Sequence, residues 1–182
     1  MADSEKLAVF IDGSSLYYSA KALGFDIDFL RLLTEFATRG VLVRVYYYTT
    51  ISEDDEFHST RKLIDWLDYN GYAVRTKPAK HHYDGEGRRK PNCNIAVELA
   101  VDAIEAAKRV DRVVLFTDDG DFRVLVEAIQ RRGVHVTVVS TLRGKPPIVS
   151  DELRRQADAF IDLKDLRASI GRAVSMPSRQ AV

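Results

Sequence analysis

Residues 112–122 read RVVLFTDDGDF, a short apolar run that ends in Asp118, Asp119, Gly120 and Asp121. An apolar run of this length, bounded by turn residues, is typical of a buried strand. The same pattern opens the chain, where residues 6–13 read KLAVFIDG and the run ends in Asp12. The sequence therefore predicts two buried strands that both deliver acids at their carboxyl ends.

Strand and helix patterns alternate through the rest of the chain. The other strands are predicted at 41–51, 72–77 and 134–140, with a short edge strand at 159–163. Helices are predicted at 15–23, 28–38, 54–70, 94–108, 121–132 and 150–157, and residues 78–91 form a surface hairpin or loop. Such alternation predicts a three-layer α/β domain, with a mainly parallel sheet between helices. The strand order that we expect is 3-2-1-4-5. We expect residues 1–171 to form one domain and residues 172–182 a disordered tail.

Composition excludes few functions. The 182 residues carry 27 basic and 27 acidic side chains, so binding to nucleic acid depends on how the charge is distributed. Cys93 is the only cysteine, which excludes an intramolecular disulfide and a zinc site built from cysteines. The chain shows neither a signal peptide nor a membrane span, and we therefore expect a cytoplasmic protein without a membrane partner.

The acids after the first and fourth strands are the candidate site. In the order 3-2-1-4-5 these strands are neighbours where the strand order reverses, which is where ligands bind in such sheets. A lone aspartate before a helix is commonly an N-cap, but crowded carboxylates repel each other unless a cation neutralises them. Oxygen ligands suit Mg²⁺ or Mn²⁺, so Asp12, Asp119 and Asp121 are the predicted ligands. For Asp118, an additional ligand and a carboxylate that faces water are both open.

At these residues the sequence resembles a known family, the NYN domains, which are PIN-like ribonucleases. The matching segments include LAVFIDGSSLYYSAKALGFDID, VELAVDA and VVLFTDDGDFRVLVEAIQRRGVHVTVVS, and the resemblance covers almost the whole chain. It implies a PIN-like, Rossmann-like fold and hydrolysis of RNA by water activated on Mg²⁺ or Mn²⁺, which about four acids hold. Asp12, Asp119 and Asp121 match three of those acids, and Ser14 or Ser15 would orient water or an aspartate.

Two positions depart from the family pattern. Ala96 stands where the fourth acid is expected, and Ser15 stands where asparagine is usual. Asn94 and Glu98 are the polar neighbours of Ala96, but on a helix each points about 160 to 200° away from it. A missing ligand lowers metal affinity, so a catalytically impaired module that binds RNA or regulates is the alternative. A phosphate-transfer domain with an aspartyl intermediate is less favoured, because no second acid follows two residues after Asp12.

Contacts with single-stranded or structured RNA would come from cations near the carboxyl edge of the sheet. The candidates are Arg88, Arg89, Lys90, Arg123, Arg143 and Lys145. Each alone is equally well described as an ordinary solvated cation, so the prediction rests on the edge that they share. A homodimer is compatible with so small a domain, and no feature of the sequence requires one.

Overall fold

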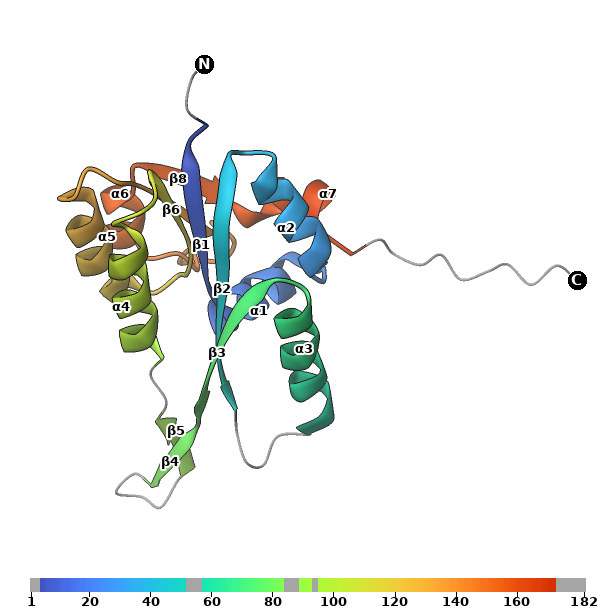
Figure 1. Cartoon of the computed structure of the whole chain (residues 1–182). Helices are drawn as coiled ribbons and strands as arrows, with labels where there is room; N and C mark the ends of the chain where they lie inside the picture. The colour runs from blue at the N-terminus through green and yellow to red at the C-terminus, as the bar shows by residue number, and fades with distance from the viewer. Residues whose placement is uncertain (1–3, 52–56, 84–88, 93–94, 173–182) are drawn as a thin grey trace, which may run out of the picture.

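The central sheet has six strands in the order β3-β2-β1-β6-β7-β8. The computed structural model describes residues 4–51, 57–83, 89–92 and 95–172. All five pairings in the sheet are parallel, and β1 lies between β2 and β6, as the sequence predicted (Figure 1). The strands are β1 (Lys6–Asp12), β2 (Val41–Ile51), β3 (Tyr72–Pro78), β6 (Arg112–Phe116), β7 (His135–Ser140) and β8 (Ala159–Asp162).

Helices cover both faces of the sheet, and the alternation of side chains along β1 explains why. Leu7, Val9 and Ile11 pack under α1, α2, α3 and α7, whereas Ala8 and Phe10 face α4, α5 and α6 (Figure 1). Both faces of β1 are buried because its residues are apolar without interruption. The helices are α1 (Gly13–Leu23), α2 (Phe29–Ala37), α3 (Phe57–Tyr69), α4 (Ala96–Ala106), α5 (Arg123–Gln130), α6 (Asp151–Gln156) and α7 (Arg167–Ile170). Among the described helices, none has the length and apolarity needed to cross a membrane.

Three local features refine the predicted elements. In the segment predicted as a hairpin or loop, β4 (Lys80–Tyr83) and β5 (Arg89–Asn92) pair antiparallel, and residues 84–88 lie outside the described residues. The helix predicted at 121–132 begins as a 3-10 turn, η1 (Gly120–Phe122), before α5. Two further elements, η2 (Leu163–Leu166) and α7, were not predicted, and they bury apolar residues at positions 163, 166 and 170. That helical spacing was a usable signal, but the segment is too short to stand out.

Three buried tyrosines hold their protons more tightly than tyrosine does in water. Burial and the nearby Asp12 carboxylate raise the pKa of Tyr47 to about 12. Burial raises the pKa of Tyr48 further, helped by the hydrogen bond that its hydroxyl donates to Asp102 Oδ2 over 2.8 Å. Burial also raises the pKa of Tyr72, whose hydroxyl donates to the carbonyl oxygen of Phe29.

We therefore expect the free energy of unfolding to fall as the pH rises above 10. Above that pH the unfolded chain releases the three protons, while the folded chain keeps them until the pH reaches its own higher pKa values. Stability is thus fully present below pH 10 and lost above it, by about 1.4 kcal/mol per pH unit for each tyrosine. Urea unfolding between pH 8 and about pH 11 measures the slope. Tyr47→Phe should reduce it, whereas replacing Tyr69, which is 91% exposed, should leave it unchanged.

Candidate functional site

The acids of the candidate site lie at the carboxyl ends of two adjacent strands. Ile11 of β1 is paired with Phe116 of β6. Asp12 is the next residue after Ile11, and Asp118 follows Phe116 by two positions. The strand register therefore brings the acid-bearing turns of β1 and β6 to one edge of the sheet, as expected from the sequence.

Asp12 caps helix α1 with its carboxylate. Its Oδ1 accepts hydrogen bonds from the backbone N–H of Ser14 at 3.1 Å and of Ser15 at 3.4 Å. The hydroxyl of Ser14 also donates to Oδ1, over 2.7 Å. Hydrogen bonds from the two serines thus fix the orientation of the half-buried Asp12 carboxylate.

Ser15 joins Asp12 to Asp118. Its hydroxyl oxygen lies 2.9 Å from Asp12 Oδ2 and 2.9 Å from Asp118 Oδ1. A hydroxyl has one hydrogen and can donate to only one of the two oxygens. Burial raises the pKa of the Asp118 carboxyl; the Ser15 hydrogen bond lowers it in part, and the charges of Asp12 and Asp119 raise it again. The Asp12 and Asp118 carboxyl groups therefore lie close together, and no lysine or arginine among the described residues forms an ion pair with either of them.

Asp119 and Asp121 are exposed and follow Asp118 in the turn before α5. Asp119 Oδ1 accepts a hydrogen bond from the backbone N–H of Asp121 at 2.9 Å, which caps the 3-10 turn η1. Asp121 lines an apolar hollow of about 280 Å³ between α4 and α5, together with Ala96. The two acids thus face different surroundings at the same edge.

The chemistry of these acids fits a hard cation, although their side chains do not enclose one. Within the described residues, no three acids, histidines or cysteines form a group that could hold a metal ion. In the same part of the chain, none of Asp12, Asp118, Asp119 and Asp121 forms an ion pair with lysine or arginine. Unpaired carboxylate oxygens are the donors that Mg²⁺ and Mn²⁺ prefer, and exposed side chains such as Asp119 and Asp121 reorient within nanoseconds.

The neighbours of Ala96 do not replace the missing acid. Ala96 is the first residue of α4 and borders the hollow beside Asp121. Glu98 instead receives a hydrogen bond from Lys77 Nζ of β3 at 2.7 Å, and this contact lowers the pKa of its carboxyl group. Asn94 lies outside the described residues. The position expected to hold the fourth ligand is therefore beside Asp121 and lacks a carboxylate.

The predicted cations divide into three groups. Arg143 and Lys145 are exposed in the loop after β7, and the described residues give neither of them an acidic partner. Arg123, at the start of α5, lies 3.8 Å from Glu127 and 4.0 Å from Glu152, which is weak pairing at a solvated surface. Arg88 lies outside the described residues, and Arg89 and Lys90 belong to β5, for which only the backbone is described.

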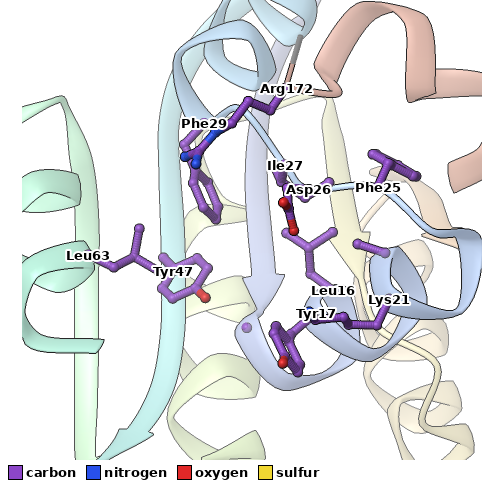
Figure 2. Close-up of a pocket in the computed structure, with 12 residues that line it drawn as sticks. Leu16, Tyr17, Lys21, Phe25, Asp26, Ile27, Phe29, Tyr47, Leu63 and Arg172 are labelled. Carbon is purple, nitrogen blue, oxygen red and sulfur yellow. The ribbon is translucent and has the colours of Figure 1, made fainter. Parts of the chain in front are cut away.

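A cleft of about 290 Å³ opens beside Gly13, the residue after Asp12, and it was not predicted from the sequence. Figure 2 shows Phe29, Tyr47 and Leu63 on one side of the cleft and Leu16, Lys21 and Phe25 on the other. We call it the tyrosine cleft, and its lining includes Gly13, Leu16, Tyr17, Lys21, Asp26, Ile27, Phe29, Tyr47 and Arg172. Tyr47 is paired with Ile11 near the carboxyl ends of β1 and β2, and no local sequence pattern marks it as part of a cleft.

Comparisons with known proteins agree with this architecture. A family model for the NYN domain matches residues 6–164. The low amplitude and bright protein LabA of Synechococcus elongatus is 36% identical over 169 residues, which cover 91% of this chain and 87% of that protein. The crystal structure of a protein of unknown function from Vibrio parahaemolyticus has a TM-score of 0.74 and 29% identity to this chain. That match covers 94% of this chain and 99% of the Vibrio chain.

Proposed function

This chain belongs to the NYN domain family, which has a PIN-like nuclease fold, and we propose that it is a divalent-metal-dependent ribonuclease. Nucleases of this family are generally dependent on divalent metals, and its domains commonly bind RNA. The observation that carries the proposal is the set of acids at the carboxyl ends of β1 and β6, which form no ion pairs among the described residues. The proposed substrate is single-stranded or structured RNA, and the proposed reaction is hydrolysis of a phosphodiester bond.

Each group has a separate part in this proposal. Asp12, Asp119 and Asp121 would hold Mg²⁺ or Mn²⁺, which when bound lowers the pKa of water and neutralises charge on the phosphate. Ser14 and Ser15 keep the Asp12 carboxylate in place through their hydroxyl groups. Arg143 and Lys145, in the exposed loop after β7, would bind phosphates of the strand.

A second function is supported by one specific residue. Ala96 provides no carboxylate beside Asp121, and the described acids do not form a metal-holding group. The chain would then bind RNA without cleaving it. The two functions share the fold and the RNA, and they differ in whether a metal ion is held tightly enough for hydrolysis.

Cleavage of a labelled single-stranded RNA, with metal removed and then restored, tests the proposal. We expect cleavage with Mn²⁺ or Mg²⁺, none with excess EDTA, and recovery when Mn²⁺ is added above the EDTA concentration. Recovery shows that metal loss and not damage to the protein stopped the reaction. RNA binding without cleavage at any metal concentration would instead support the binding module.

A further inference from the structure

One wall of the tyrosine cleft carries a hydroxyl group that has no hydrogen-bond partner among the described residues. Tyr47 is 6% exposed, and its ring is held edge-on against Phe29, with the ring centroids 5.6 Å apart. Its hydroxyl oxygen comes so close to Gly13 that a Cβ added there would lie 2.7 Å away. Within the described residues, this hydroxyl makes no hydrogen bond. The residue is buried as a whole, but its hydroxyl lines the open cleft and is therefore available to hydrogen-bond with a ligand there.

The other residues that line the cleft indicate which kind of ligand fits it. Leu16 and Ile27 give it an apolar floor, and Tyr17, which is 57% exposed, presents an aromatic ring at its opening. Lys21 Nζ lies 5.5 Å from the centroid of that ring, and Arg172 lies on the other side near Phe29 (Figure 2). Neither cation forms an ion pair among the described residues, and Asp26 is the one carboxylate that the lining includes, so the two cations leave one positive charge in excess. A flat apolar group with polar edges and a negative charge matches this lining, and a nucleotide has all three.

The place of the cleft connects it to the acids. Gly13 lines the cleft and directly follows Asp12 in the chain. A volume of about 290 Å³ is near the lower end for small-ligand pockets, which suits one base and not a longer segment. A base in a duplex is stacked and paired, so only an unpaired base can enter such a pocket.

We propose that the tyrosine cleft binds one unpaired base of an RNA strand whose adjoining phosphodiester lies at the acids. Tyr17 stacks on the base, and the Tyr47 hydroxyl forms a hydrogen bond with its edge. Lys21 and Arg172 bind the flanking phosphates. This assignment rests on the proposed function for the identity of the ligand, and it makes single-stranded RNA the substrate class.

Binding in EDTA tests the assignment without cleavage. The probe is a fluorescent RNA of about twelve nucleotides, used as a single strand, as a duplex, and with abasic sites in place of its bases. We expect the single strand to bind at least about tenfold more tightly than either other form, because stacking contributes strongly for each base. Tyr17→Ala should weaken binding about tenfold, and Tyr47→Phe, which keeps the ring, about fivefold. Tyr69→Ala on α3, outside the cleft, is the control and should bind as the natural protein does.

Four results would overturn the assignment. They are equal binding of single strand and duplex, equal binding of the abasic strand, unchanged binding by both cleft variants, and displacement of the strand by a free nucleoside monophosphate at the same concentration. The last would mean that the cleft takes a free nucleotide. Cleavage assays with Mn²⁺ on the same proteins separate the two proposals. If the natural protein cleaves RNA and the cleft variants bind RNA normally, only the assignment of the cleft is rejected. If the cleft variants lose RNA binding but the natural protein does not cleave, only the proposed nuclease activity is rejected.

Discussion

Replacing Asp12 by asparagine is expected to lower the rate of RNA cleavage by about a hundredfold or more, with little loss of stability. Asparagine keeps an oxygen that accepts the backbone N–H groups of Ser14 and Ser15, and it caps helices about as well as aspartate. Its amide can also donate to the Ser15 hydroxyl, which is then free to donate to Asp118. The variant therefore removes one negative charge and preserves the hydrogen bonds.

Single-turnover cleavage in saturating Mn²⁺ and thermal unfolding of the same samples measure the two effects. Asp162→Asn is the matched control, because Asp162 also ends a strand and caps a 3-10 turn, two strands away from β6. It should cleave RNA as the natural protein does, even if its stability falls slightly. Cleavage by Asp12→Asn at the natural rate would show that Asp12, and with it the carboxyl end of β1, takes no part in the reaction.

The central position of β1 and β6 could be predicted because residues 7–11 and 113–116 are apolar without interruption. Such runs leave few alternatives to strands buried on both faces, and the acids at their ends follow directly in the sequence. A one-dimensional pattern therefore predicted that Asp12 and Asp118 share an edge. It could not predict that Ser15 lies between them, because that contact depends on the rotamers of three side chains.

The tyrosine cleft lay beyond sequence reasoning for a different reason. Its lining comes from positions 13, 29, 47 and 172, which only the tertiary fold brings together. The triplet at 46–48 alternates between the two faces of β2, and nothing local to it tells which tyrosine lacks a hydrogen-bond partner. Sites made from distant segments become visible only when burial and bonding are known for each atom.

Ala96→Asp is expected to tighten Mn²⁺ binding by about tenfold to a hundredfold and to raise the cleavage rate. Ala96 shares the hollow of about 280 Å³ with Asp121, which leaves room for a carboxylate there. The first turn of α4 also favours an acid, because its N-cap residue Ile95 provides no side-chain hydrogen bond. Calorimetric titration with Mn²⁺ measures the affinity, and cleavage of the single-stranded RNA measures the rate.

The sign of the effect on stability makes this prediction specific to the metal. Without metal, the new carboxylate repels Asp121 and should lower the melting temperature, whereas saturating Mn²⁺ should raise it above that of the natural protein. Val101→Asp adds the same charge to α4 on a residue that is 57% exposed and lies outside the hollow, so it should show neither change. Equal Mn²⁺ affinity of the Ala96→Asp and Val101→Asp variants would show that a carboxylate in the hollow does not join the acids in binding the metal. Cleavage by Ala96→Asp alone, with none by the natural protein, would mean that the fold retains a nuclease site that this alanine has disabled.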